Sequence, residues 1–443
     1  MDTVYFRLVL SPYSLVLTKM IDLKHLRENQ AWYEKAFAKK LAKVDIPHVL
    51  KLDAEYKDML VKVEEKRSEK NKVSKLIPTY KDAERQTKIA EMKALDAKLK
   101  ESEEQLNKLI VQLKEVTDTI PNPPHDSVPE GKTEAESVVV RTVGKPPKFD
   151  FKPKDHIELG LLLDLIDADT ATKTSGARFY YLKNEAVILE FALVSWLFSK
   201  YVKKGFTPVT VPMLVKEQMM YATGFFPADR SEIYHVNPGE DDLYLVGTSE
   251  VPLAGLHMFE PLPAEQMPKR YIGFSSCFRR EAGSYGKDTK GILRVHQFEK
   301  MEMFSFCHPD KSWEEHDFLL SCEEEILTEL GLPYHVLNIC GGDLGNPAAK
   351  KYDCEAWIPS QEKYRELTSS SNCTDYQARR GGIRYKDENG THFAHTLNGT
   401  AMAFTRTLIA ILENYQKEDG SVEIPKVLQK YTGFKVIKPK KNV

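Results

Sequence analysis

The chain has 443 residues and 42% hydrophobic content, which suffices for a sizeable core spread over two or more domains. Its 63 lysines and arginines balance 65 aspartates and glutamates, so the net charge of -2 excludes a uniformly basic or acidic protein. The six cysteines form no Cys-x-x-Cys pair, which excludes a zinc ribbon and a disulfide scaffold and favours a reducing, cytoplasmic location. The sequence has no apolar run of the roughly 20 residues that cross a bilayer, so we expect no membrane span.

The first 19 residues form a short apolar tract with an acidic residue, Asp2, and only two basic residues. This composition fits neither a secretory signal peptide nor a transit peptide. We interpret residues 1–19 as an extension or an upstream start, and Met20 as the natural beginning of the protein.

Residues 51–119 predict two long helices, because they contain no glycine and a single proline, Pro78. Apolar residues recur three and four positions apart on both sides of that proline, as in a heptad seam. Lys66 and Lys70 interrupt the first seam, and Ser102 interrupts the second. The pattern predicts an antiparallel helical hairpin whose helices are each on the order of 40–55 Å long.

The tip of this predicted hairpin is basic, with six basic residues and one acidic residue between positions 66 and 81. A solvated coiled-coil face is the ordinary explanation of such a charge run. Lysines at seam positions cost packing, however, so a poorly zipped basic tip indicates an anionic partner. From charge alone, the predicted contacts are Lys66, Arg67, Lys70, Lys72 and Lys75.

The proline-rich stretch "IPNPPHDSVPEGK" is typical of a linker. After it, strand-like and helical segments alternate irregularly. This alternation predicts an α+β fold, with an antiparallel sheet and flanking helices. The predicted organisation is an extension (1–19), a helical arm domain (20–120), a linker (121–135), an α+β domain (136–433) and a basic tail (434–443).

The stretch Cys277–Phe304, "CFRREAGSYGKDTKGILRVHQFEKMEMF", predicts two strands joined by a basic, glycine-rich loop at 282–291. It has neither the Walker spacing nor a dinucleotide-binding fingerprint. A bound nucleotide would therefore be held by arginine side chains, each of which can bind two phosphate oxygens at once, and Phe298 would stack on the base. A basic surface hairpin without a ligand also fits this stretch alone.

Three further stretches combine carboxylates, hydroxyls and an arginine. "LYLVGTSEVPL" places Thr248 and Glu250 two residues apart, on one face of a strand or at its end. "YRELTSSSN" contains Glu366 and Ser369, hard oxygen ligands of the kind that Mg²⁺ prefers. "HTLNGTAMAFTRTLIAILEN" carries Arg406 in an apolar helix. Taken singly, each also fits a solvated strand face, a turn or cap, or a helix surface.

Together these stretches resemble the signature motifs of class II aminoacyl-tRNA synthetases, and specifically the seryl-tRNA synthetase family of bacterial and organellar type. "GFTPVTVPMLV" is similar to motif 1, with Pro212 at its diagnostic position. Phe278–Phe304 is similar to motif 2, "LNGTAMAFTRTLIAILEN" to motif 3, and the hairpin to the tRNA-binding arm. The resemblance runs from Met20 to about Gly433, and implies a sheet of six or so antiparallel strands and a homodimer.

The resemblance also implies the activity. Serine and ATP, with Mg²⁺, give seryl-adenylate and pyrophosphate, and the seryl group then passes to serine tRNA or, where it exists, selenocysteine tRNA. Arg279, Arg406 and Glu366 are the implied catalytic residues. The implied ATP site comprises Arg279, Arg280, Glu281, Arg294, Val295, Phe298, Glu366, Leu367, Thr368, Ser369 and Arg406, with Glu366 and Ser369 holding the metal. The implied serine site comprises Thr248, Ser249, Glu250, Arg279, Glu302, Asn398 and Thr400.

The chain departs from the family in the motif 2 loop, where Tyr285 and Lys287 leave the contacts with the tRNA acceptor end open. Two alternatives remain: a paralogue without this catalysis, and a coiled-coil protein with a degenerate globular domain. The long arm, together with Arg279 and Arg406, argues against both.

Overall fold

The computed structural model describes residues 20–282 and 290–440, which form two compact units. Of the described residues, one unit holds 20–38 and 42–121, and the other holds 39–41, 122–282 and 290–440. The interpretations of residues 1–19, and of Tyr285 and Lys287, lie outside the described residues. No helix within the described ranges is long and apolar enough to cross a membrane.

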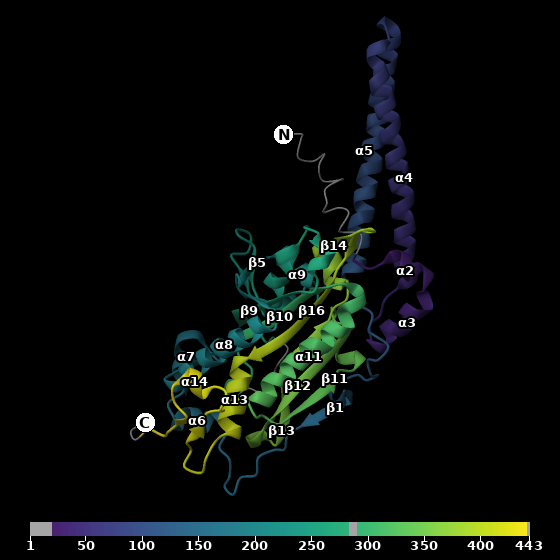
Figure 1. Ribbon diagram of the computed structural model, residues 1–443. Helices are drawn as coiled ribbons and strands as arrows, with labels where there is room; N and C mark the ends of the chain where they lie inside the picture. Colours follow the sequence, from purple (N-terminus) through teal and green to yellow (C-terminus); the bar gives the residue numbers. More distant parts are fainter. Residues whose placement is uncertain (1–19, 283–289, 441–443) are drawn as a thin grey trace. The chain divides into compact units, whose positions relative to one another are not determined.

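The first unit is dominated by two long helices, α4 and α5, which run side by side in Figure 1. Asp45 caps α4 by accepting a hydrogen bond from the amide of His48, and a short 3₁₀ turn that contains Pro78 separates the two helices. The predicted hairpin is therefore confirmed. The helices are α2 (Leu23–Glu28), α3 (Gln30–Lys39), α4 (Ile46–Leu76) and α5 (Asp82–Asp118).

The polar interruptions of the two seams meet each other. The ammonium of Lys66 donates a hydrogen bond to Ser102 Oγ at 2.6 Å, in a seam that otherwise buries Val63, Leu99 and Leu106. The ammonium of Lys66 and the hydroxyl of Ser102 therefore satisfy each other at seam positions where apolar side chains are missing.

Two other basic residues near the tip are also paired between the helices. Arg67 binds Glu103 at 2.7 Å, and Lys70 binds Asp96 at 2.7 Å. The expectation of a poorly zipped tip is thus wrong at these positions, because the second helix supplies a partner for each cation. Lys72 and Lys75 are exposed and make no salt bridge with the described residues.

The second unit is built on an eight-stranded sheet in the order β1-β11-β12-β13-β16-β10-β9-β4. All neighbouring strands are antiparallel except β4, which runs parallel to β9 at the edge. The α+β prediction is confirmed, with more strands than the six or so expected. The strands are β1 (Val138–Val143), β4 (Thr207–Thr210), β9 (Lys269–Phe278), β10 (Gln297–Cys307), β11 (Tyr334–Asn338), β12 (Lys350–Ile358), β13 (Lys363–Asn372) and β16 (His395–Ala403).

Helices pack against this sheet and share its main hydrophobic core (Figure 1). They are α8 (Glu185–Lys203), α11 (Ser312–Glu329) and α13 (Phe404–Asn414), with the shorter α6 (His156–Leu162) and α14 (Gln429–Thr432). The short helices α9 (Glu217–Thr223), α10 (Glu250–Ala254) and α12 (Tyr376–Gly381) belong to smaller, separate hydrophobic clusters, and α7 (Ala168–Ser175) lies outside the main core. The remaining strands form small sheets: β2 (Ile166–Asp167), β3 (Tyr181–Leu182), β5 (Leu214–Lys216), β6 (His235–Val236), β7 (Leu243–Leu245), β8 (Leu262–Pro263), β14 (Arg384–Asp387), β15 (Gly390–Phe393), β17 (Val422–Glu423) and β18 (Val436–Ile437).

The pairing of Lys66 with Ser102 leads to a testable expectation for the arm. Ser102→Ala leaves the partly buried ammonium without its hydroxyl partner, which costs about 1–3 kcal/mol of local stability. Hydrogen exchange of the amides in α4 and α5 should accelerate accordingly, while Ser68→Ala, at an exposed position of α4, should leave it unchanged. Equal exchange in both variants would show that the pair contributes nothing.

Candidate active site

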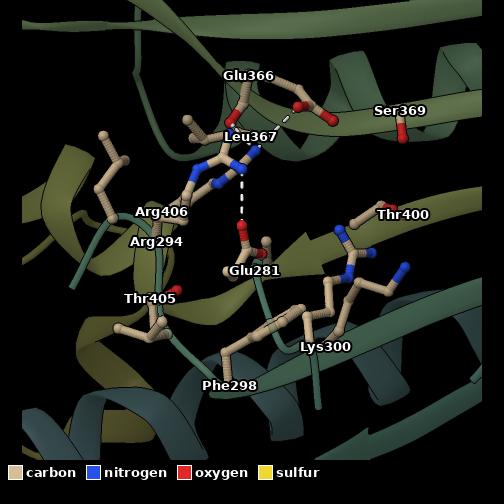
Figure 2. A pocket seen from close by; sticks show the side chains of 14 residues that line it. Glu281, Arg294, Phe298, Lys300, Glu366, Leu367, Ser369, Thr400, Thr405 and Arg406 are labelled. Carbon is tan, nitrogen blue, oxygen red and sulfur yellow. Dashed lines mark hydrogen bonds and ion pairs between the residues drawn. The ribbon is translucent and has the colours of Figure 1, made fainter. Parts of the chain in front are cut away.

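Two adjoining cavities open on the eight-stranded sheet. The first, which we call the arginine cavity, has an empty volume of about 590 Å³. Its lining is drawn in Figure 2 and comprises Arg279, Glu281, Leu293, Arg294, Val295, Phe298, Lys300, Glu366, Leu367, Ser369, Thr400, Ala403, Thr405 and Arg406. The second, which we call the glutamate cavity, has an empty volume of about 950 Å³ and contains Thr248, Glu250, Glu302 and Asn398.

Ion pairs hold the arginines of the arginine cavity. Arg294 binds Glu281 at 2.7 Å, and Arg406 binds both the carboxylate of Glu366 at 3.0 Å and its backbone carbonyl at 2.9 Å (Figure 2). Arg294 Nε is buried and has no hydrogen-bond partner among the described residues. The cavity thus presents guanidinium groups that carboxylates hold in place, and one of them has an unused N–H donor. Such a cavity suits an anionic ligand.

A β-bulge brings Glu366 and Ser369 to the same cavity. Side chains three apart on a regular strand point to opposite faces. In β13, however, Thr368 pairs with Cys354 and Glu366 with Glu355, so one extra residue, Leu367, resets the alternation. Burial alone would raise the pKa of Glu366, but the charges of Arg406 and Lys351 lower it to about 2. The cavity therefore holds an ionised carboxylate and a hydroxyl next to each other along the strand.

The glutamate cavity centres on two buried carboxylates. Glu250 is the first residue of α10, and Glu302 lies on β10, where it accepts a hydrogen bond from Thr400 at 3.3 Å. Burial, and then the nearby Glu302, raise the pKa of Glu250 to about 7. Of the two interpretations of Thr248 and Glu250, the strand face is wrong, because β7 ends at Leu245 and both residues follow it. Thr248 follows the end of the strand, whereas Glu250 already belongs to α10.

One residue that the sequence analysis missed, Lys300, lines both cavities. Its ammonium binds Glu302 at 2.5 Å, and its side chain is only 9% exposed. The signal was present in the sequence. Lys300 lies midway between Phe298 and Glu302 on one strand, and alternate residues of a strand share a face, whereas the intervening Met301 belongs to the core. The cavities also share Arg279, Ser369 and Thr400.

Three predicted site residues do not line either cavity. Ser249 Oγ is buried against Ser275 Oγ at 2.7 Å, and Thr368 turns toward α11, where it donates to Glu323 at 3.1 Å. Arg280 follows the end of β9, and its amide donates to the carbonyl of Glu232. Only Thr368 lies on a strand, where the alternation of side chains turns it away from the cavity. Ser249 precedes α10 and Arg280 follows the end of β9, so strand alternation does not apply to them.

Family comparisons agree with this geometry. A model described as the tRNA synthetase class II core domain (G, H, P, S and T) matches residues 233–415. With its antiparallel sheet and its two arginine-bearing stretches, the chain is a class II aminoacyl-tRNA synthetase. A second model, the seryl-tRNA synthetase N-terminal domain, matches residues 20–124.

Relatives that match nearly the whole chain identify the amino acid within this class. A serine–tRNA ligase of Thermobifida fusca (strain YX) is 47% identical over 425 residues, 95% of this chain and 99% of the relative. One of Nocardia farcinica (strain IFM 10152) is 46% identical over 424 residues, 95% and 100% of the two chains.

A solved structure of seryl-tRNA synthetase from Pyrococcus horikoshii, complexed with ATP, matches with a TM-score of 0.87 and 41% identity over 95% of this chain and 100% of its own. The cytoplasmic serine–tRNA ligase of Naegleria fowleri, in complex with AMP, gives a TM-score of 0.84 and 35% identity over 95% and 99%. The chain belongs to the seryl-tRNA synthetase family, and its activity is that of an ATP-dependent serine–tRNA ligase.

The buried pair of Lys300 and Glu302 leads to a stability prediction. Lys300→Met leaves a buried carboxylate without its ammonium and close to a second carboxylate, Glu250, which costs about 3–5 kcal/mol. Urea denaturation should show this loss, and the double variant Lys300→Met/Glu302→Gln should recover most of it. If the double variant is as unstable as the single one, the cost comes from lost packing and not from the unpaired charge.

Proposed function

We propose that the two cavities hold the two substrates of the first reaction step, ATP in the arginine cavity and serine in the glutamate cavity. The observation that carries this assignment is their common wall of Arg279, Lys300, Ser369 and Thr400. There, a serine carboxylate oxygen would attack the α-phosphorus while the bond to pyrophosphate breaks. A hydroxyl of the terminal adenosine of tRNA would then attack the carbonyl of the adenylate, releasing AMP.

In the arginine cavity, Phe298 offers its ring to the adenine, and the arginines meet the phosphates. Arg279, whose guanidinium lies 5.4 Å from the centre of the Phe298 ring, extends to the common wall and suits the α-phosphate. Arg294 and Arg406, held by Glu281 and Glu366, suit the remaining phosphates. No protein nucleophile takes part, so catalysis consists of positioning and of stabilising charge on the phosphates.

We further propose that Mg²⁺ accompanies ATP at Glu366 and Ser369. A carboxylate that is ionised at neutral pH beside a hydroxyl is a suitable set of hard oxygen donors. The phosphate oxygens of ATP would supply further ligands of the ion. The ion would neutralise the charge of the departing pyrophosphate.

In the glutamate cavity, the substrate ammonium would meet Glu250 and Thr248, and its hydroxyl would meet Glu302 and Thr400. Glu302 and Thr400 are buried and already share a hydrogen bond, which a serine hydroxyl can join and an alanine cannot. A site built to pair a hydroxyl rejects the analogue without it, because its own polar groups would stay unpaired.

The long hairpin of the first unit is proposed to bind the tRNA, through the long variable arm of serine tRNA and, where it exists, of selenocysteine tRNA. Lys72 and Lys75 are exposed near its tip and free of salt bridges to the described residues, so their charges are available to phosphates. Lys66, Arg67 and Lys70 bind the opposite helix instead, and their predicted role is correspondingly weaker.

A homodimer is proposed from the apolar surface of α8 and the sheet edge. Ile188 and Phe191 on α8 are 47% and 60% exposed, and Leu161 and Tyr181 are exposed as well. The edge strand β4, which precedes Pro212, leaves one side without a strand neighbour in the described chain. Large exposed apolar side chains next to an open strand edge are typical of a subunit interface.

The cytoplasmic location of the protein stays a prediction.

Serine activation is expected to depend on the protonation of Glu250. Its pKa of about 7 means that the carboxylate is lost as the pH falls through 7, and with it the attraction for the substrate ammonium. The kcat/KM for serine in ATP–pyrophosphate exchange should therefore rise between pH 6 and pH 8, with an apparent pKa of about 7. Glu250→Gln should be weak and flat over this range. A wild-type profile without this rise would argue against Glu250 as the ammonium site.

Shortening the arm is expected to separate the two reaction steps. Replacing residues 67–101 by a glycine-containing turn keeps Val63 and Leu106 of the seam and removes the tip. Serine-dependent pyrophosphate exchange without tRNA should stay within about twofold, while aminoacylation should fall by about two orders of magnitude or more, as expected from the loss of several phosphate contacts. Lys72→Ala/Lys75→Ala should reproduce part of this loss. Undiminished aminoacylation would rule out the tip as the tRNA contact.

A further inference from the structure

The carboxylate of Glu250 is held on one side only. Two neutral amides donate to the same oxygen, Oε1: Gln377 Nε2 at 2.7 Å and Asn398 Nδ2 at 2.9 Å. The second oxygen, Oε2, accepts no hydrogen bond from the described residues, and the side chain lines the glutamate cavity. One oxygen is therefore anchored and the other is left for a ligand.

Gln377 is itself fixed at both ends of its amide. Its side chain is fully buried on α12, and its Oε1 accepts a hydrogen bond from the hydroxyl of Thr396 at 2.8 Å. Its Nε2 also donates to the carbonyl of Thr223 at 3.3 Å. A flipped amide would set its oxygen against the oxygens of Glu250 and of the Thr223 carbonyl, neither of which can donate, so only the observed orientation satisfies these partners.

A neutral donor has an advantage over a cation at this position. A lysine or arginine at residue 377 would neutralise Glu250 and compete with a substrate ammonium for it, whereas an amide orients the carboxylate and leaves its charge. The charged and titratable groups that act on Glu250 are Glu302 and Lys300 of β10, Arg279 after β9, and Cys373 after β13. None of them takes the place of the amide at Oε1.

We propose that Gln377 is a positioning residue of the serine site, which orients Glu250 so that its free oxygen receives the ammonium of serine. This inference rests on the proposed assignment of serine to the glutamate cavity. Gln377 does not line the cavity and acts only through Glu250. It is therefore expected to govern the affinity for serine and to leave the binding of ATP unchanged.

The test is ATP–pyrophosphate exchange by the full-length protein with Gln377→Met, which keeps the length of the side chain and removes its hydrogen bonds. The KM for serine should rise about tenfold, which corresponds to the loss of one good hydrogen bond to a charged group. The KM for ATP should stay within about twofold. Because the Gln377 hydrogen bond lowers the pKa of Glu250, the rise of kcat/KM for serine should move to higher pH.

Gln416→Met is the matched control. Gln416 is also a buried glutamine, and its Nε2 donates to two backbone carbonyls, those of Lys154 and Glu413, outside both cavities. It should lose stability without any change in the KM for serine or in the pH profile. If Gln377→Met behaves like this control, its role is structural and the inference is wrong.

Two further variants keep the result interpretable. Thr396→Val removes the hydroxyl that orients Gln377, without touching Glu250, and should raise the KM for serine about threefold even if Gln377→Met fails to fold. Glu250→Gln tests the proposed site itself. If Glu250→Gln raises the KM for serine and both other variants leave it unchanged, only the inference about Gln377 fails. If Glu250→Gln leaves it unchanged, the assignment of serine to this cavity fails.

Discussion

The site depends on one constraint: each of its carboxylates buried at the eight-stranded sheet needs a cation or hydrogen-bond donors as partners. Glu302 is paired with Lys300, Glu366 with Arg406, and Glu250 with two amides. An unpaired buried charge costs several kcal/mol, so these partners fix the side chains in place before any substrate arrives. The site is thus preorganised by the same interactions that make its burial tolerable.

Preorganisation also explains why the chemistry needs no protein nucleophile. The arginines are oriented by carboxylates, and the carboxylates are oriented by cations or amides, so the ends of two substrates can be brought together at a common wall. The two carboxylates of the glutamate cavity differ in their partners. Glu302 has an ammonium, and Glu250 has only neutral donors, which leaves its charge for a cationic ligand. In the proposed assignment, this difference would separate the recognition of the serine hydroxyl from that of its amino group.

Much of the architecture could be predicted from the sequence, because it follows from local patterns. Seam spacing predicted the hairpin, and the resemblance to the family's motifs and serine-type signatures predicted the class II sheet and most of the lining of the arginine cavity, but less than half of the lining of the glutamate cavity. The pairing of Lys66 with Ser102 could not be predicted, because the register between two helices depends on the geometry of the turn that joins them. Gln377 was missed for a similar reason. It lies 127 residues from Glu250, and only the fold brings the two together.

Errors in the predicted site came from treating neighbours in sequence as neighbours in space. Ser249 and Thr368 adjoin true lining residues and point elsewhere, while Lys300 was passed over between two residues that were predicted. In β13 the opposite happened: Glu366 and Ser369 share a cavity only because a bulge at Leu367 resets the alternation. Such bulges have no reliable signature in a single sequence.

The central claim is that the glutamate cavity selects an amino acid by its hydroxyl and activates it at the common wall. The most direct measurement is ATP–pyrophosphate exchange without tRNA, with serine, alanine, threonine and cysteine in parallel. The account predicts exchange with serine and almost none with alanine, which has no hydroxyl to join Glu302 and Thr400. Comparable exchange with alanine, or no exchange with serine from folded protein, would contradict it.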